Sequence, residues 1–450
     1  ANRMFQKVLI ANRGEIAVRI IQACRDLGII SVAVYSEADR EALHAQIADE
    51  AVCIGPARAA DSYLNMDNII SAALASGCQA IHPGFGFLSE NPDFAERITQ
   101  AGLAFIGPTA ATIRLMGDKS EAKRNAIAAG VPVALGTDGP LRDFDEAISE
   151  AERIGYPVML KAASGGGGKG IRVAESVKDL KDAYDSAAAE AIANFGDGRL
   201  YMEKYIHNPR HIEVQILGDN YGNVVHLFER ECSVQRRHQK LIEESPSAFV
   251  TPELREKMTS AAVALAKRVG YRNAGTIEFL VDNDRNFYFC EMNTRIQVEH
   301  PVTEEVTGVD LVCEQLRVAA GEPLSFKQED LTIRGHAIEC RINAEDPSRN
   351  FAPCPGTLVS LHLPGGPGVR VDSAAYQGYK IPPFYDSMIG KLIVYGADRE
   401  QAIVRMRRAL AEMLFEGVVT ATDYQMHILC SKAFVEANFN VNSIANGDFD

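Results

Sequence analysis

Short apolar stretches alternate with helix-patterned segments near the start of the chain, and this alternation restricts the fold more than any other feature. Residues 7–11 form an apolar run, and residues 14–27 carry apolar side chains at helical spacing. Gly28 is a plausible helix stop, and a second apolar run follows at 29–35. A strand–helix–strand unit of this length predicts a parallel sheet covered by helices. The turn at 12–15 has a single glycine, so the dinucleotide-binding fingerprint is absent.

Length and charge narrow the class of protein further. The 450 residues correspond to about three domains. The formal net charge is −14, from 46 Lys and Arg against 60 Asp and Glu. Such an acidic chain repels nucleic acid and anionic membranes, so neither is expected as a partner. No apolar run approaches the roughly 18 residues of a membrane span, and the first residues lack the apolar core of a secretion signal.

The nine cysteines are irregularly spaced, and no C-x-x-C occurs. This pattern argues against a disulfide framework and against a zinc ribbon, and it predicts a cytoplasmic location. Further along the chain, residue patterns predict strands over 156–161, 200–206, 211–217 and 223–228. They predict helices over 119–129, 252–269 and 399–415, the first capped by Asp118 and the last stopped by Gly417.

A hairpin signal in the middle of the chain carries the most specific chemistry. Residues 276–281 and 287–293 are β-patterned and flank a polar turn. If the turn is the four residues 283–286, Glu278 and Glu291 lie directly opposite each other, with Cβ atoms about 5 Å apart. Two such carboxylates repel by roughly 3 kcal/mol, so a positive charge is expected between them, and Mg²⁺ or Mn²⁺ with a nucleotide fits. A turn one residue longer or shorter would remove this pairing.

Polar residues continue at every second position beyond this hairpin: Glu291, Asn293, Arg295, Gln297 and Glu299. In an extended chain all five side chains face one side. An amphipathic strand with its polar side in water has the same pattern, and on pattern alone it is the more frequent case. The mixture of two acids, two amides and one arginine next to a facing carboxylate favours a binding site instead.

Residues 164–170 contain four consecutive glycines and Lys169. Glycine-rich turns present successive N–H groups to anions, but Gly170 after the lysine excludes a Walker A loop. A flexible linker has a similar composition, whereas the position between Lys161 and Glu203 favours a mobile lid over phosphates. Residues 230–240 form a basic cluster that is interpreted as a solvated charge run, with Cys232 as a packed thiol rather than a nucleophile.

Four longer motifs occur in order along the chain: IANRGEIA at 10–17, HPGFGFLSEN at 82–91, MGDK at 116–119 and EMNTRIQVEHP at 291–301. Together they resemble biotin carboxylase, a member of the ATP-grasp superfamily, and the resemblance runs from about residue 7 to residue 444. It implies an α/β and α+β architecture with a mobile glycine-rich lid. The implied domains are an N-terminal parallel-sheet α/β domain, an ATP-grasp domain whose lid covers about 134–206, and a C-terminal mixed domain, at 1–116, 117–333 and 334–450.

The resemblance implies that ATP phosphorylates bicarbonate to carboxyphosphate, which supplies CO₂ to a ureido nitrogen of biotin. The expected cofactors and substrates are ATP, Mg²⁺ or Mn²⁺, bicarbonate and biotin. No Ala-Met-Lys-Met sequence is present, so biotin is expected on a separate biotin carboxyl carrier protein. The other expected partners are a second copy of this chain, in a homodimer, and a carboxyltransferase subunit. The expected acceptor is an acyl-CoA or a 2-oxoacid, and acetyl-CoA carboxylase of fatty acid biosynthesis is favoured.

The resemblance also assigns roles to the residues that match its motifs. The expected nucleotide-binding residues are Lys119, Lys161, Gly165, Gly166, Gly167, Gly168, Glu203, Lys204, Ile206, His211, Gln235, His238, Glu278 and Leu280. The expected metal ligands are Glu278, Glu291 and Asn293. The expected bicarbonate-binding residues are Lys240, Arg295, Gln297, Val298 and Glu299.

The expected catalytic residues are Glu299, Arg341, Lys240 and Arg295. Glu299 is the general base that deprotonates bicarbonate, and Arg341 stabilises the enolate oxygen of biotin. Phe85 and Arg341 are expected to contact biotin, and Phe85 replaces a tyrosine found in many members. Without the resemblance, Arg341 would be interpreted as a surface arginine at a strand edge.

Two other functions are open on this sequence. One is a different ATP-grasp ligase that joins a carboxylate to an amine through an acyl phosphate, and the run 295–299 argues against it. The other is a catalytically silent nucleotide-binding regulator. The presence of Glu278, Glu291, Arg295, Glu299 and Arg341 argues against that function.

Overall fold

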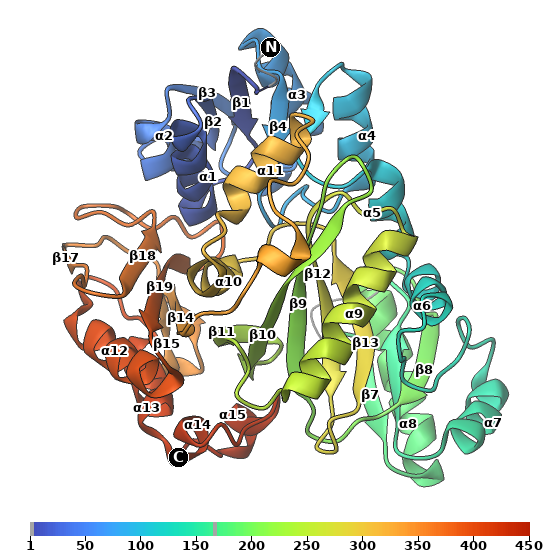
Figure 1. The fold of residues 1–450 in the computed structure, drawn as a ribbon. Coiled ribbons are helices and arrows are strands. Elements are labelled where there is room, and N and C mark those ends of the chain that lie inside the picture. The colour runs from blue at the N-terminus through green and yellow to red at the C-terminus, as the bar shows by residue number, and fades with distance from the viewer. Residues whose placement is uncertain (1–3, 165–168) are drawn as a thin grey trace.

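The structure is a computed structural model that describes residues 4–164 and 169–450 (Figure 1). The predictions for the four glycines at 165–168 lie outside the described residues. A five-stranded sheet near the N-terminus has the order β3-β2-β1-β4-β5, and every pairing in it is parallel. The predicted parallel sheet is therefore confirmed. Its strands are β1 (Lys7–Ile10), β2 (Ile30–Ser36), β3 (Glu50–Gly55), β4 (Ala80–His82) and β5 (Ala104–Phe105).

Helix α1 (Gly14–Asp26) forms as predicted because Ile16, Ile20 and Ala23 fall on one face and are buried against the sheet. Gly28 follows it with φ 70°, as expected for a helix stop. The other helices up to residue 128 are α2 (Leu43–Ile47), α3 (Met66–Ala75), α4 (Pro92–Gln100), α5 (Ala110–Gly117) and α6 (Lys119–Ala128). Asp118 caps α6 as predicted, since its carboxylate accepts from the backbone N–H groups of Ser120 and Glu121.

An eight-stranded antiparallel sheet forms the centre of the molecule, in the order β13-β12-β9-β10-β11-β14-β19-β18. The strands are β9 (Arg210–Gly218), β10 (Val224–Arg236), β11 (Gln239–Ser245), β12 (Asn273–Val281), β13 (Phe287–Asn293), β14 (His336–Asn343), β18 (Val369–Ser373) and β19 (Met388–Gly396). β11 pairs with β14, so the sheet continues across residues 333 and 334. The domain boundary expected there falls in the loop before β14.

A separate three-stranded antiparallel sheet has the order β7-β6-β8. It consists of β6 (Val158–Ala162), β7 (Ile171–Ala174) and β8 (Leu200–Lys204), and it packs with α7 (Phe144–Ile154) and α8 (Val177–Phe195). These elements gather beyond β13 at the lower right of Figure 1. They have their own hydrophobic core, which includes Leu160, Leu180 and Met202. The expected lid segment therefore contains an independently packed unit.

The remaining helices include α9, which forms over nearly the predicted range. They are α9 (Pro252–Arg268), α10 (His300–Thr307), α11 (Leu311–Ala319), α12 (Arg399–Glu412), α13 (Thr422–Cys430), α14 (Lys432–Val435) and α15 (Ser443–Asn446). The remaining strands are β15 (Glu345–Asp346), β16 (Ala352–Pro353), β17 (Ser360–His362) and β20 (Leu414–Glu416). No helix in the described residues is long and apolar enough to cross a membrane.

The predicted end of the last long helix is wrong. The pattern places that end at Phe415, but α12 ends at Glu412 and the chain continues as β20, which pairs with β17. Gly417 follows this strand rather than the helix. It has φ 101°, and a Cβ there would lie 2.0 Å from the carbonyl oxygen of Thr357. The strand pairing outweighs the helical pattern at this end.

Candidate active site

The hairpin of β12 and β13 places Glu278 directly opposite Glu291, as predicted, but by a different route. Val281 pairs with Phe287, so the turn is one residue longer than assumed. A register shift beyond Phe279 and Phe289 then restores the pairing of the two glutamates. This shift is a β-bulge, in which one extra residue of β13 is left out of the ladder.

The two facing carboxylates repel each other, as the sequence predicted. The carboxylate of Glu278 raises the pKa of Glu291 to about 8. Asn293 donates a hydrogen bond from Nδ2 to Glu278 Oε1 at 2.6 Å, which leaves its amide oxygen as an additional oxygen ligand. Two carboxylates and an amide oxygen form a hard oxygen donor set, so these three residues fit a Mg²⁺ or Mn²⁺ ion.

The polar alternation after Glu291 does not continue as a strand. β13 ends at Asn293, and the chain turns before α10 begins at His300, so the prediction of one extended polar face is wrong. The side chain of Arg295 pairs instead with Glu90, with its Nε 2.8 Å from Glu90 Oε1. Gln297 and Glu299 are nevertheless buried at 2% and 1% exposure, next to the hairpin. The turn after Asn293 therefore places Gln297 and Glu299 near the hairpin glutamates. An extended strand would carry both side chains away from that hairpin.

Lys240 lies at the centre of a cluster of carboxylates. Its Nζ is 2.6 Å from Glu299 Oε1, 3.2 Å from Glu213 Oε2 and 3.5 Å from Glu278 Oε1. Burial opposes a charge here, but the three carboxylates outweigh it and raise the pKa of Lys240 well above its ordinary value. The ammonium group therefore stays charged and joins the hairpin to the start of α10.

Arg341 in β14 contacts the other oxygen of the same glutamate. Its Nη2 donates to Glu299 Oε2 at 2.9 Å, and its Nε donates to Glu243 Oε1 at 2.5 Å. Glu299 is thus held by two cations from two different strands. The alternative interpretation of Arg341 as a surface arginine at a strand edge is wrong, because the side chain is largely buried and pairs with two glutamates. Val298 contributes its carbonyl oxygen to the buried ammonium of Lys391 at 2.7 Å.

The expected nucleotide-binding lysines lie on or beside the three-stranded sheet. Lys161 in β6 pairs with Glu203 in β8 at 2.5 Å, and Lys119 at the start of α6 donates to the carbonyl oxygen of Ala162 at 3.0 Å. Lys204 instead donates to the carbonyl oxygens of Gly155 and Tyr156, at 2.9 and 2.7 Å. The ammonium group of Lys204 therefore binds the backbone of the loop before β6.

The other expected nucleotide residues lie on the central sheet. His211 of β9 is the register partner of Leu280 and lies 3.6 Å from Glu278 Oε2. Burial opposes its charged form, but the carboxylates of Glu278 and Glu213 outweigh burial and raise the pKa of His211 to about 9. Gln235 donates to the carbonyl oxygen of Cys232, and His238 lies in the tight turn between β10 and β11. Ile206 follows β8 and is half-buried.

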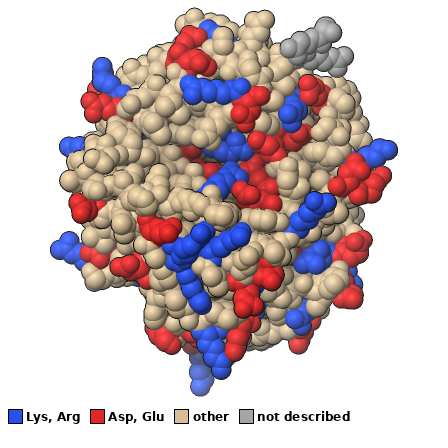
Figure 2. All heavy atoms as spheres, turned by 60° about the vertical axis from the view of Figure 1, so that its left-hand side comes forward, with Lys and Arg blue, Asp and Glu red and all other residues tan. Residues whose placement is uncertain are grey.

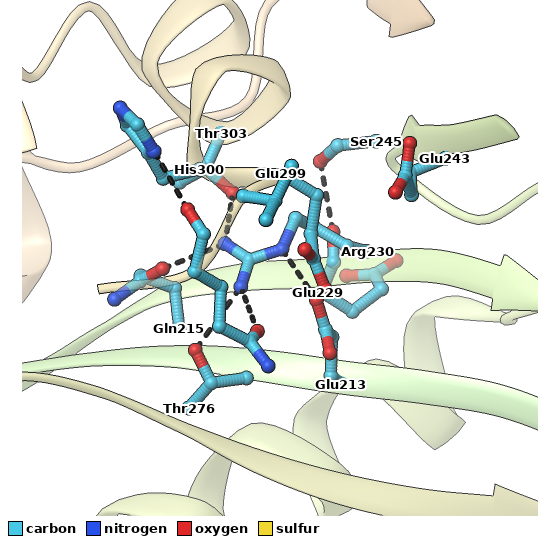
Figure 3. Close-up of polar contacts among 12 residues, drawn as sticks. Glu213, Gln215, Glu229, Arg230, Glu243, Ser245, Thr276, Glu299, His300 and Thr303 are labelled. Atoms are coloured by element: carbon cyan, nitrogen blue, oxygen red, sulfur yellow. Dashed lines mark hydrogen bonds and ion pairs between the residues drawn. The ribbon is translucent and has the colours of Figure 1, made fainter. Parts of the chain in front are cut away.

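Figure 3 shows a buried arginine that the sequence pattern did not reveal. Arg230 has no exposed surface, and residues 231–235 after it in β10 are buried too. The interpretation of 230–240 as a solvated run is therefore wrong over 230–235, and the exposed residues are 237–239 in the turn. The guanidinium of Arg230 donates to five side chains at 2.6–3.0 Å: Glu213, Gln215, Thr276, Gln297 and Thr303. The Nη2 group of Arg230 thereby fixes the amide oxygen of Gln297. A polar alternation in β9, with His211, Glu213 and Gln215 between buried aliphatic residues, is the signal that could have revealed this polar core.

Two further expectations have structural outcomes. Cys232 is buried, and burial raises the pKa of its thiol well above the ordinary value, as expected of a packed thiol. Phe85 packs against the core beneath the five-stranded sheet, and its carbonyl oxygen accepts from Asn12 Nδ2 at 2.7 Å. That core includes residues of the central sheet and α11 as well as residues of the five-stranded sheet and α1.

The antiparallel sheets, with lysines and paired carboxylates along them, define an ATP-grasp protein. Residues 118–327 match the family described as the ATP binding domain of the carbamoyl-phosphate synthase L chain. The biotin carboxylase N-terminal and C-terminal domain families match residues 4–113 and 339–446. The chain belongs to the biotin carboxylase family.

Individual relatives are similar over 96–99% of this chain. Biotin carboxylase 1 of Bacillus subtilis is 56% identical, with 99% of each chain covered. A pyruvate carboxylase subunit from Methanothermobacter thermautotrophicus is 57% identical over 96% of this chain and 88% of its own. The biotin carboxylase domain dimer of the 2-oxoglutarate carboxylase of Hydrogenobacter thermophilus, solved with MgADP, ADP and bicarbonate, has a TM-score of 0.95 and 51% identity, with 99% of each chain covered.

Proposed function

We propose that this protein carboxylates biotin on a separate carrier protein, with ATP and bicarbonate as co-substrates and carboxyphosphate as the intermediate. The observation that carries the proposal is the position of Glu299, whose two oxygens contact Lys240 and Arg341 at 2.6 and 2.9 Å. A buried carboxylate held in one orientation by two cations suits a general base, because the cations also attract the anionic substrate from which it takes a proton.

The nucleotide is proposed to bind along the three-stranded sheet. Lys161 and Lys119 would contact its phosphates, and Glu203, Lys204, Ile206, His211, Gln235, His238 and Leu280 would line the rest of the site. Glu278, Glu291 and Asn293 would hold Mg²⁺, which would supply positive charge that offsets the negative charge of the nucleotide phosphates. The family match to an ATP binding domain over 118–327 supports this assignment.

Bicarbonate is proposed to bind among Lys240, Arg295, Gln297, Val298 and Glu299. Bicarbonate must lose its proton to attack the γ-phosphate, and Glu299 is the carboxylate placed to accept that proton. Lys240 stabilises the anion, and Arg230 holds Gln297 in one orientation. Arg295 would exchange part of its pairing with Glu90 for the substrate.

Biotin is proposed to enter beside Arg341, whose guanidinium can stabilise the negative charge that develops on the ureido oxygen. Phe85, in the loop after β4, remains the proposed apolar contact for the ring. The segment 134–206 would close over the site, because carboxyphosphate is labile in water and solvent must be excluded while CO₂ is transferred.

The proposal is tested by ADP formation with purified protein. We expect turnover that requires ATP, bicarbonate and free biotin together, and that carboxylates free biotin. Turnover that ignores biotin but requires an amine would favour the carboxylate–amine ligase instead. ATP binding without any biotin-stimulated turnover would favour the silent regulator.

The wider assembly is part of the same proposal. We propose a homodimer that works with a biotin carboxyl carrier protein and a carboxyltransferase subunit in the cytoplasm, as the first half-reaction of an acyl-CoA or 2-oxoacid carboxylase, acetyl-CoA carboxylase foremost. The relatives named above include a pyruvate and a 2-oxoglutarate carboxylase. Co-purification of the carboxyltransferase identifies the acceptor, and sedimentation velocity tests the dimer.

The face that includes α1 and β18 bears on the dimer. It carries a pocket of about 490 Å³ with Arg19, Glu304, Asp310, Arg370 and Asp372 in its lining. Figure 2, which turns the left side of Figure 1 forward, shows acidic and basic side chains meeting in a hollow near the middle of the view. Such a mixed-charge surface suits contact with an identical surface, which would offer both signs of charge in return.

A further inference from the structure

A second pair of facing glutamates lies behind Arg341. Glu243 in β11 and Glu339 in β14 are direct register partners, and neither side chain has any exposed surface. Alternation along β14 puts Glu339 and Arg341 on one face of the sheet, while Ile338 and Cys340 pack into the core on the other face. The pair is therefore a built feature of the sheet beneath the site.

The oxygens of this pair are short of hydrogen-bond donors. Glu243 Oε1 accepts from Arg341 Nε at 2.5 Å. Glu243 Oε2 and both oxygens of Glu339 have no hydrogen-bond partner among the described residues. The two side chains are nevertheless neighbours on one face of the sheet, because Glu243 and Glu339 are direct register partners, and two buried carboxylates so placed repel strongly. One proton between them converts this repulsion into a strong O–H···O⁻ hydrogen bond.

The cations nearby are already used. Lys391, the register partner of Arg341 in β19, binds the carbonyl oxygen of Val298 and lies 3.2 Å from Glu15. Lys240 is surrounded by three other carboxylates. Arg341 is shared between Glu243 and Glu299.

The proton is expected on Glu339. Burial and the neighbouring Glu243 raise the pKa of Glu339 well above its ordinary value. Burial also raises the pKa of Glu243, but the guanidinium of Arg341, 2.5 Å away, opposes that rise and favours the charged form of Glu243 over that of Glu339.

We propose that Glu243 and Glu339 share one proton, and that this pair is a positioning device that holds Arg341 against Glu299. The neutral Glu339 donates to Glu243, which fixes the Glu243 oxygen that accepts from Arg341 Nε. With Nε held, the far side of the guanidinium is directed at Glu299 and at the space proposed for biotin. Neither glutamate touches the substrate, and the inference rests on the proposed function for what Arg341 does there.

Three variants test the pair by turnover. Glu339→Gln keeps a donor toward Glu243, so we expect kcat for biotin carboxylation to stay within about twofold of the unaltered protein. Glu339→Leu removes the donor at similar volume, and we expect kcat to fall about tenfold or more, with KM for ATP unchanged. Glu243→Gln removes the charge that orients Arg341, and it should match Glu339→Leu. Equal kcat in the two Glu339 variants, both folded by circular dichroism, would overturn the proposal.

A spectroscopic measurement tests the proton without turnover. The infrared difference between the unaltered protein and Glu339→Gln, near neutral pH, should contain the carbonyl band of a neutral carboxylic acid. The same band should persist in Glu299→Gln. A difference spectrum that shows a carboxylate instead would overturn the shared proton. Because this readout needs no substrate, it separates failure of the pair from failure of the proposed carboxylation, which the biotin- and bicarbonate-dependent ADP assay reports.

Discussion

At the scale of single residues, the site is built around one carboxylate with two fixed neighbours. Lys240 and Arg341 each hold one oxygen of Glu299, at 2.6 and 2.9 Å. Both cations are tied to further carboxylates, Glu213 for the lysine and Glu243 for the arginine. The orientation of Glu299 is therefore set before a substrate arrives, which is the arrangement that lowers the cost of a proton transfer.

Replacement of the proposed base tests this arrangement. We expect Glu299→Gln to lower kcat for biotin carboxylation by about 10²- to 10⁴-fold, because the amide cannot accept the proton of bicarbonate. ATP affinity, measured by titration calorimetry, should change little. Lys161→Ala is the matched control and should weaken ATP binding. A comparable loss of ATP affinity in Glu299→Gln would contradict the assigned role.

Arg230 offers a test of stability rather than chemistry. It is fully buried and donates to five side chains, so Arg230→Met breaks a buried ion pair and leaves Glu213 Oε1 and four other buried acceptors without their donor, while Glu213 Oε2 keeps Lys240. We expect the free energy of unfolding to fall by about 3–5 kcal/mol. Urea denaturation measures this change, and Arg142→Met, at an exposed ion pair, is the control with an expected change below about 0.5 kcal/mol. Equal midpoints for the two variants would contradict the structural role of Arg230.

At the scale of elements, Glu244 fastens β11 to the C-terminal helices. It contacts His336 of β14 at 2.8 Å and Arg399 of α12 at 3.0 Å, and Arg399 also donates to the carbonyl oxygens of Phe434 and Val435. Burial opposes the charge of Glu244, but Arg399 and His336 outweigh burial and lower its pKa to about 2.

This shift predicts a pH dependence of stability. Because the pKa of Glu244 is lower in the folded state, its contribution is complete above about pH 4.5 and is lost as the pH falls toward about 2. The size of the shift corresponds to about 3 kcal/mol at neutral pH. We expect urea midpoints of Glu244→Gln to lie below those of the unaltered protein at pH 7 and to approach them as the pH drops below about 4.5. A constant difference across this range would contradict the prediction.

The elements also show what the sequence could predict. Helix α1 and the parallel sheet follow from local periodicity, which is a short-range property. A four-residue turn predicts the pairing of Glu278 with Glu291, but that pairing depends on a β-bulge in β13 that periodicity does not reveal. The turn before His300 could not be predicted, because polar alternation fits an extended chain equally well and tertiary contacts decide. The burial of Arg230 and the pairing of Glu243 with Glu339 depend on strands that are far apart in sequence, and no local pattern reports which strands become neighbours.

At the scale of the whole molecule, the unit of β6, β7 and β8 is packed around its own core, separate from the central sheet. We expect it to move against that sheet when nucleotide binds. Amide hydrogen exchange in Val158–Ala162 and Leu200–Lys204 should slow with Mg-ATP, since closure removes these strands from solvent. Lys161→Ala should show no such slowing. Identical exchange with and without nucleotide in the unaltered protein would contradict closure.

The continuous ladder from β11 to β14 limits how the chain can be divided. Glu299 lies before the expected domain boundary at residues 333 and 334, and Arg341 lies after it. Four register pairs nevertheless join β11 to β14 across that boundary, from Ile242 with Cys340 to Ser245 with Ala337. Cutting the chain between the strands and separating the pieces would leave a row of unpaired backbone groups on each fragment. Exposed strand edges with unpaired backbone groups pair readily with other strands. Fragments produced separately should therefore aggregate or recombine with each other rather than fold as stable halves.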